Sequence, residues 1–159
     1  MNTSMLFGKH FILCMLAVTI WAKAAGALEI RVPPLTVKAG QSIEIPIIVD
    51  EVDNLAGVRL VLTYDPEMLT YKKGAKTKET DSLMHIVNDK KPGILILVMA
   101  GARGVKGKDL PVFTLTFDAT KGLQQNQTTK ISITESQLMG DDLKERKCTI
   151  VTHPVTLTP

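Results

Sequence analysis

The sequence has little cysteine, with only Cys14 and Cys148 among its 159 residues. Removal of the first 27 residues, for which the evidence is given below, would leave Cys148 alone. No disulfide could then form within the chain. The fold must therefore be held by packing and hydrogen bonds, without the covalent links on which many small secreted domains depend.

Histidine is also scarce, and its scarcity counts against an enzyme. Beyond residue 27 only His85 and His153 remain, each within a segment expected to be a strand. A catalytic triad is recognised by its geometry and not by its order in the chain, but nothing in the sequence places a nucleophile beside either imidazole. The sequence therefore predicts a protein that is not an enzyme and carries no cofactor.

Aromatic residues make up 4% of the chain, and the single tryptophan, Trp21, lies near the N-terminus. Beyond residue 27 the aromatic rings are those of Tyr64, Tyr71, Phe113 and Phe117. Modules that bind crystalline polysaccharide usually present a row of exposed rings, which supply a large apolar area. Such a row is hard to build from these four residues, so polysaccharide binding remains a second hypothesis.

Two charged segments have the composition, but not the spacing, of ligand sites. The acidic residues 50–54 do not match the spacing of a calcium-binding loop, and we expect a solvated acidic loop with no metal. The glycine-rich basic segment 101–108 has the wrong spacing for a phosphate-binding loop, and Asp109 stands where a hydroxyl residue is required. We expect a mobile basic loop here, with Arg103 available to a partner.

Residues 1–27 have the pattern of a secretory signal peptide. Lys9 and His10 precede an apolar run, Phe11–Trp21, and A-x-A sequences place cleavage after Ala24 or Ala27. The apolar run is shorter than the roughly 20 residues that a membrane-spanning helix needs. The prediction is a secreted or periplasmic protein with no transmembrane segment in the mature chain.

The net charge of +3 belongs partly to this N-terminal segment. Removing Lys9 and Lys23 from the 19 basic residues leaves 17 against 16 acidic residues, a net of +1. A protein that binds nucleic acid usually carries a strong positive field. The composition therefore predicts no nucleic-acid partner.

Period-2 alternation of apolar residues dominates residues 28–159 and predicts strands separated by turn residues. The expected strands are Leu28–Val32, Ser42–Val49, Ala56–Tyr64, Leu69–Lys72, Leu83–Asn88, Gly93–Ala100, Val112–Asp118, Lys130–Glu135 and Thr149–Thr158. About nine strands without helical segments predict an all-β fold, an antiparallel β-sandwich of jelly-roll type in one domain. An internal repeat or a second domain is not expected.

Several of these segments, in this order, resemble the cohesin domain family. VKAGQSIEIPI (residues 37–47) is similar to its opening turn and strand, and NLAGVRLVLTYDPEML (54–69) to its third strand and the turn that follows. GILILVMAG (93–101) and LPVFTLTFDAT (110–120) resemble two later strands. The resemblance implies a sandwich whose outer face on one sheet binds a dockerin, through apolar contacts ringed by hydrogen-bonding side chains.

The resemblance and the alternation together predict the residues of that face. The candidate partner-binding residues are Gly57, Arg59, Val61, Thr63, Ile96, Val98, Ala100 and Arg103. Residues 93–100 are apolar throughout, so their outward side chains would form an exposed patch of the kind that marks interaction sites. Alternatively, a loop or a chain terminus covers this face and the strand is buried on both sides. The sequence leaves both open.

One departure from the family bears on the partner. Many type I cohesins carry an asparagine and an aspartate where this chain has Gly57 and Arg59. Replacing an acceptor by an arginine, which only donates, reverses the electrostatic preference there. The prediction is a secreted, non-enzymatic recognition module that binds a protein, either a dockerin divergent enough to offer an acidic group or another partner. Its expected context is extracellular polysaccharide degradation or another surface assembly. A carbohydrate-binding module is the alternative, and a structural or adhesin-like module is the third.

Overall fold

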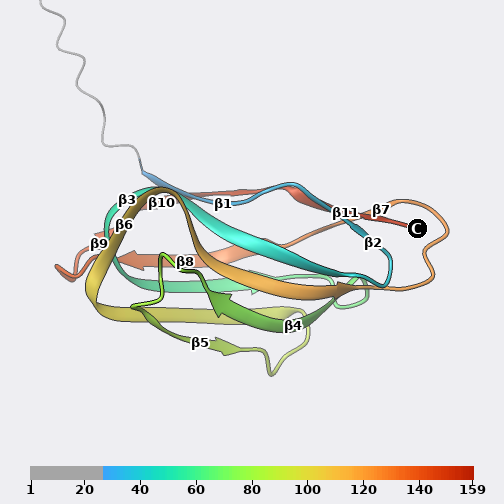
Figure 1. Ribbon diagram of the computed structural model, residues 1–159, viewed down its shortest axis with the longest axis horizontal. Coiled ribbons are helices and arrows are strands. Elements are labelled where there is room, and N and C mark those ends of the chain that lie inside the picture. The colour runs from blue at the N-terminus through green and yellow to red at the C-terminus, as the bar shows by residue number, and fades with distance from the viewer. Residues whose placement is uncertain (1–26) are drawn as a thin grey trace, which may run out of the picture.

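The computed structural model describes residues 27–159, so the predicted signal peptide, apart from Ala27, lies outside the described residues. The described residues form strands and turns, and none of their segments is a helix able to cross a membrane. The strands are β1 (Leu28–Val32), β2 (Leu35–Lys38), β3 (Ser42–Thr63), β4 (Leu69–Lys76), β5 (Met84–Asn88), β6 (Ile94–Ala119), β7 (Gln127–Lys130), β8 (Ser132–Met139), β9 (Glu145–Arg146), β10 (Cys148–Thr152) and β11 (Pro154–Thr158) (Figure 1).

Two long strands, β3 and β6, pair with each other along most of their length and belong to both layers of a sandwich. Residues 42–49 of β3 pair with residues 110–118 of β6 in the first layer, whose strand order is β10–β1–β3–β6–β4. Residues 57–63 of β3 pair with residues 94–100 of β6 in the second layer, where β8 and β5 flank them. Both strands turn between the layers at the left-hand end of Figure 1.

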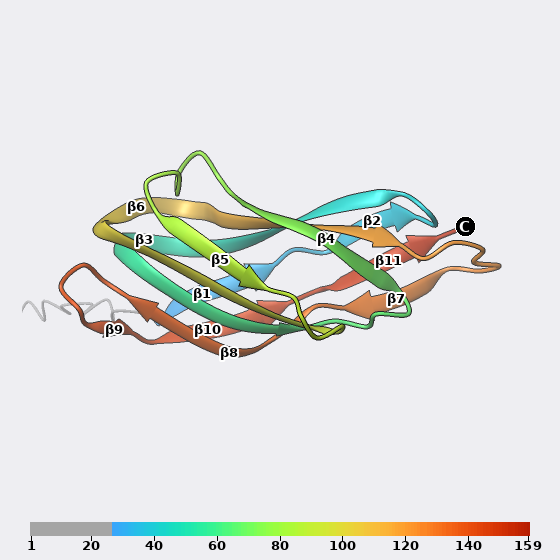
Figure 2. The ribbon, with the colours of Figure 1, turned by 90° about the horizontal axis from the view of Figure 1, so that it is seen from below.

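The predicted all-β sandwich is confirmed, with two parallel pairings among the antiparallel ones. β1 pairs β10 in parallel, and β2 pairs β11 in parallel. Both layers belong to one eight-stranded sheet, and a separate three-stranded sheet, in the order β2–β11–β7, extends the molecule beside the C-terminus (Figure 2). The two parallel pairs join strands from the two ends of the sequence, so the beginning and the end of the described chain hold each other in place.

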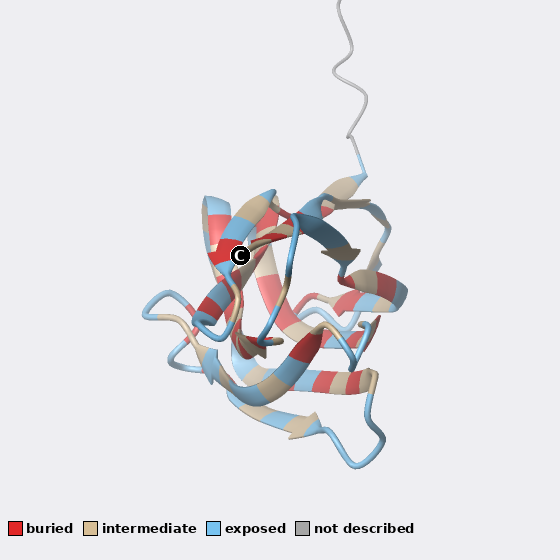
Figure 3. Cartoon of the chain, turned by 90° about the vertical axis from the view of Figure 1, so that its right-hand side faces the viewer, coloured by how far each residue is buried: buried red, intermediate tan, exposed pale blue. Residues whose placement is uncertain are grey.

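The core lies between the layers and is built by the alternation that the sequence shows. Leu60 and Leu62 of β3 are fully buried, as are Phe113, Leu115 and Phe117 of β6. Figure 3 shows such buried residues alternating with exposed ones along the strands. Full burial of a large apolar side chain stabilises the fold by about 1.5–3 kcal/mol relative to exposure. The core therefore fixes which side of each strand faces the solvent.

The two charged segments that we expected to be loops are strands. The same cause, their pairing with each other, makes both expectations wrong. The acidic residues 50–54 lie within β3 and the basic residues 101–108 within β6, and the two segments pair across the bend. Glu51 lies opposite Lys108, with its carboxylate 3.2 Å from the ammonium group. Opposite charges on facing strands attract. Each segment looks like a loop when taken alone, but its pairing with the other stabilises it as a strand.

This pairing also explains why the strand count differs from about nine. The segments expected at 42–49 and 56–64 are joined in β3, and those at 93–100 and 112–118 are joined in β6. The segments expected at 130–135 and 149–158 are instead divided, the first between β7 and β8 and the second between β10 and β11. The short strands β2 and β9 were not predicted, because runs of four and two residues give little periodicity to read.

Candidate interaction surface

The solvent side of the second layer carries outward residues from β8, β3, β6 and β5, which we call the outer face. It consists of Glu135, Gln137 and Met139 from β8; Gly57, Arg59, Val61 and Thr63 from β3; Ile94, Ile96, Val98 and Ala100 from β6; and Met84, Ile86 and Asn88 from β5. The register holds these residues side by side. Arg59 lies opposite Gln137 on one side and Val98 on the other, and Val98 lies opposite Ile86.

Seven of the eight residues predicted from the sequence meet on this face. Their strand neighbours Val58, Leu60, Leu62, Leu95, Leu97 and Met99 are buried, so the predicted inward and outward sides are confirmed. Gly57 pairs with Ala100, Arg59 with Val98 and Val61 with Ile96, which brings the two predicted sets together. Their part in binding remains a prediction.

Arg103 lies apart from the other seven. It is an exposed residue in the bend of β6, beyond the point at which Gly57 pairs with Ala100. Its segment is held in place, because the nearby Gly104 amide donates to the carboxylate of Asp141 at 3.1 Å. Arg103 is thus at the end of the outer face and belongs to a paired strand, not to the mobile loop that we expected.

The outer face is open to solvent within the described chain. The side chains of Met84 and Ile86 are 78% and 72% exposed, and Val98 is 40% exposed. The C-terminus lies at the far end of the molecule, beside β7 and β11. The sequence left open whether this face is exposed or covered. Within residues 27–159 it is exposed, since Met84, Ile86 and Val98 form a contiguous apolar patch along β5 and β6. Such patches commonly mark interaction sites.

An ion pair lies next to this patch. Arg59 Nη1 on β3 is 2.8 Å from Glu135 Oε2 on β8, and both side chains are partly exposed, at 44% and 60%. A bulge in the β3–β8 pairing between Val61 and Leu62 leaves both Thr134 and Glu135 exposed. The sequence predicted Arg59 as a cationic donor on this face, and the structure adds a counter-ion, Glu135, whose position depends on non-local pairing.

The outer face has a shallow hollow at Gly57. A shallow depression of about 240 Å³ lies between Gly57, Arg59, Val98, Gln137 and Met139. A Cβ atom added at Gly57 would lie 3.1 Å from the Cβ of Met139, which is tight for ordinary packing. Gly57 therefore allows Met139 of β8 to approach β3 closely, and the recess lies beside the ion pair.

A second hollow, of about 340 Å³, continues the outer face toward the bend. Its lining includes Ala56, Ala100, Ala102 and Met139, with Leu143 at its border. Leu143 is 81% exposed and has a positive φ of 59°, which is uncommon for a residue other than glycine. The apolar surface therefore extends from β5 to the turn between β8 and β9.

Comparison with known proteins identifies the fold and the family. The family model described as "Cohesin domain" matches residues 28–156. The chain belongs to the cohesin family. No curated protein sequence matches it.

Solved cohesin structures share the fold of this cohesin at low sequence identity. The sixth cohesin of scaffoldin B from Acetivibrio cellulolyticus, in complex with Cel5 dockerin, has a TM-score of 0.73 at 14% identity, over 84% of this chain and 99% of that one. A non-cellulosomal cohesin from the hyperthermophilic archaeon Archaeoglobus fulgidus has a TM-score of 0.71 at 14% identity, over 84% and 91%. A chain of a type I cohesin–dockerin complex from Clostridium thermocellum has a TM-score of 0.67 at 20% identity, over 85% and 96%.

The aromatic rings of this cohesin serve its core. Phe113 and Phe117 are fully buried, and Tyr64 and Tyr71 pack edge-on against Phe117 with ring centroids 5.0 and 5.7 Å away. Burial, and then the nearby charge of Asp89, raise the pKa of the Tyr71 hydroxyl. None of these four rings joins a flat exposed row, which counts against the carbohydrate-binding alternative.

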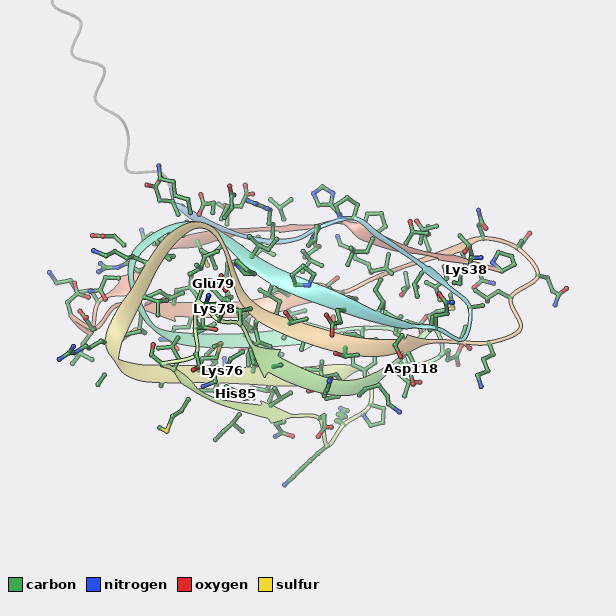
Figure 4. All side chains as sticks on the ribbon, in the orientation of Figure 1. Lys38, Lys76, Lys78, Glu79, His85 and Asp118 are labelled. Atoms are coloured by element: carbon green, nitrogen blue, oxygen red, sulfur yellow. The ribbon has the colours of Figure 1, made fainter. Side chains whose placement is uncertain are left out.

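His85 also has a packing role in this cohesin. It lies on β5 beside the connection from β4, where Figure 4 labels it near Lys76. Its imidazole packs edge-on against Phe113, with ring centroids 5.1 Å apart. As one of the inward residues of β5, His85 thus helps to anchor this strand to the core, while Met84 and Ile86 on either side remain exposed to solvent.

Proposed function

We propose that this cohesin is a protein-binding module and that the outer face of β8, β3, β6 and β5 is its docking surface. The observation that carries the proposal is the open apolar patch of Met84, Ile86 and Val98 beside the Arg59–Glu135 ion pair. Protein interfaces combine an apolar centre with a polar border, and the outer face has this arrangement. The hollow at Gly57 adds a recess for an anchoring side chain of the partner.

The proposed partner is a dockerin, or a divergent relative of one, that presents a carboxylate toward Arg59. Similar structures include cohesins in complex with dockerins, which supports this class. A carboxylate of the partner that approaches Arg59 would also come close to Glu135, whose own carboxylate is 2.8 Å from the guanidinium. Because unmatched charges at an interface weaken the wrong complexes, Arg59 would favour a partner that presents an acidic group, and Glu135 would compete with that group for the guanidinium.

Export from the cell is part of the proposal. It is supported by the signal-peptide pattern of residues 1–27, with its basic start, apolar run and A-x-A sites. A role in extracellular polysaccharide degradation would come from the partner, if the partner is an enzyme that acts on such a polymer. The cohesin itself would then supply attachment and no chemistry.

The test compares the wild type with the variants Val98→Asp and Ile150→Asp. Each protein is used to capture the partner from the culture supernatant, and its affinity for the captured partner is then measured. Val98→Asp places a charge in the patch and is expected to weaken binding by at least about tenfold, or 1.4 kcal/mol. Ile150→Asp is the matched control, since Ile150 is a strand isoleucine of similar exposure, 38%, on β10 outside the outer face. Equal loss in both variants, with circular dichroism unchanged, would refute the docking surface.

A further inference from the structure

We propose that the exported protein begins at Leu28 and that its terminal ammonium group is held in an acidic hollow beside β1. This inference rests on the proposed export, in which the signal peptide is removed. The hollow has a volume of about 540 Å³ and lies where β1 begins, near the end of the molecule at which β3 and β6 bend (Figure 1). Its lining comes from Ala27 and Leu28, from residues 51–55 of β3 and from residues 145–147 at β9.

The nitrogen of Leu28 has a fixed position at this hollow. It donates to the carbonyl oxygen of Lys147 at 3.0 Å, and both residues line the hollow. Leu28 also lies opposite Cys148 in the parallel pairing of β1 with β10, so β1 is held from its first residue. A charge placed on this nitrogen would therefore stay at the hollow.

Cleavage after Ala27 would create that charge. The signal peptidase of the cell hydrolyses the Ala27–Leu28 peptide bond: water supplies the hydroxyl group of the new Ala27 carboxyl group, and the Leu28 nitrogen leaves as an amine. At pH 7 an α-amino group is mostly protonated. The resulting ammonium group has three N–H donors, of which one keeps the bond to the Lys147 carbonyl and two are available to carboxylates.

The lining of the hollow has an excess of negative charge that one ammonium group would balance. Its ionisable side chains are three carboxylates and two cations, namely Glu51, Asp53, Glu145, Arg146 and Lys147. Two of these already have partners, since Glu51 pairs with Lys108 and Arg146 with Asp142. Within residues 27–159 no ion pair includes Asp53 or Glu145. These two carboxylates are the groups that we assign to the ammonium.

The geometry favours cleavage after Ala27 over cleavage after Ala24. Ala27 is exposed and precedes the first residue of β1, so the strand pairing does not depend on it. A chain that begins at Ala25 would carry its ammonium group three residues before Leu28, up to about 10 Å away in an extended chain. The acidic hollow would then face the neutral amide of Leu28.

The N-terminus of the protein exported by its expressing cell tests the first part of the proposal. Mass spectrometry of the intact protein and of its N-terminal peptide should show a chain that starts at Leu28. A start at Ala25, or at any other residue, would overturn this inference and leave the proposed export intact. A protein that retains residues 1–27 would contradict the export as well. Partner capture tests the docking surface independently of all these outcomes.

The reactivity of the terminal amine tests the second part. Only the neutral amine is acylated, so a carboxylate that stabilises the ammonium form slows the reaction. At pH 7 an N-hydroxysuccinimide ester of acetic acid should acylate Leu28 about two- to fivefold faster in Asp53→Asn and in Glu145→Gln than in the wild type, the range expected for an exposed ion pair. Glu44→Gln is the matched control, because Glu44 is also an exposed acidic residue of β3 but does not line the hollow.

Salt distinguishes this electrostatic effect from a change in structure. The faster acylation of the two hollow variants should approach the wild-type rate in 1 M salt, where charges are screened beyond about 3 Å. Equal rates in all four proteins, an equal increase in Glu44→Gln, or a difference that persists in 1 M salt would overturn the proposed seat of the ammonium group. Circular dichroism checks that each variant keeps its sheet.

Discussion

Arg59 on β3 and Glu135 on β8 form an ion pair across the outer face, with Nη1 2.8 Å from Oε2. The pair lies beside the recess at Gly57 and next to Val98, which faces Arg59 across β3 and β6. Arg59 is thus a cation with a fixed counter-ion at the centre of the proposed docking surface. A partner must either accommodate both charges or compete with Glu135 for the guanidinium.

Removing the counter-ion is expected to strengthen partner binding. In Glu135→Gln the Arg59 guanidinium loses the neighbouring carboxylate and becomes free for a carboxylate of the partner, whereas Arg59→Glu repels it. Titration calorimetry with the captured partner should show tighter binding for Glu135→Gln and weaker binding for Arg59→Glu. Arg31→Glu is the control, because Arg31 is also a strand arginine in an ion pair, with Asp109, but lies in the first layer. Weaker binding of Glu135→Gln would mean that the partner needs Glu135 itself.

The same ion pair should matter little for stability. Both side chains are partly exposed, and pairs of this kind contribute about 0–1 kcal/mol because solvent screens them. A double-mutant cycle with Arg59→Ala and Glu135→Ala, followed by urea unfolding, should give a coupling energy of less than about 1 kcal/mol. A larger coupling would show that the pair holds the sheet together and would weaken its assignment to partner selection.

Thr80 is expected to be a stability determinant of the segment that leads into β5. It is fully buried; its hydroxyl donates to the Val112 carbonyl at 2.8 Å and accepts the Thr77 amide at 3.1 Å. Thr80→Val leaves these groups unpaired and should lower the free energy of unfolding by about 1–3 kcal/mol, measured by urea denaturation. Thr149→Val, which affects only an exposed 3.4 Å contact, should change it by less than about 0.5 kcal/mol. Equal effects would contradict this role.

Acid should reveal the contact between Ser42 and Asp118. The hydrogen bond from the Ser42 hydroxyl, and then the nearby Lys72 ammonium, hold the pKa of the Asp118 carboxyl below its usual value. Because the folded-state pKa is lowered, the ionised carboxylate adds stability above its unfolded pKa, and this is lost as the pH falls through the folded value. Ser42→Ala should raise the pKa of Asp118, as seen by NMR titration of the carboxyl carbon. The stability difference between variant and wild type should then shrink in acid. An unchanged pKa would show that Lys72 dominates.

Local alternation was enough to predict the sides of the main strands. Leu60 and Leu62 are buried and Arg59 is exposed, as their positions in a period-2 pattern require. The family resemblance added the identity of the sheet that carries the outer face. Both kinds of information are present within short segments of the chain, which is why seven of the eight predicted residues lie together.

The remaining features of the surface depend on pairing between distant segments. Glu135 reaches Arg59 because β8 lies beside β3 with a bulge, and neither fact is visible in residues 132–139 alone. The acidic segment 50–54 and the basic segment 101–108 each looked like a solvated loop, because each carries charge of mainly one sign. Their charges balance only when the two segments pair across the bend. Met84 and Ile86 were missed as surface residues, because apolar residues on both sides of a strand usually indicate burial on both faces, whereas β5 has only one paired neighbour among the described strands.

A footprint of the bound partner is the most direct test of the docking surface. Methyl NMR spectra of the cohesin, recorded with and without the captured partner, report on Ile86, Ile96 and Val98 of the outer face and on Ile150 of β10 as an internal reference. The account predicts large shifts for the three outer-face residues and none for Ile150. Shifts confined to Ile150 and to the small β2–β11–β7 sheet, with Ile86 and Val98 unchanged, would contradict it.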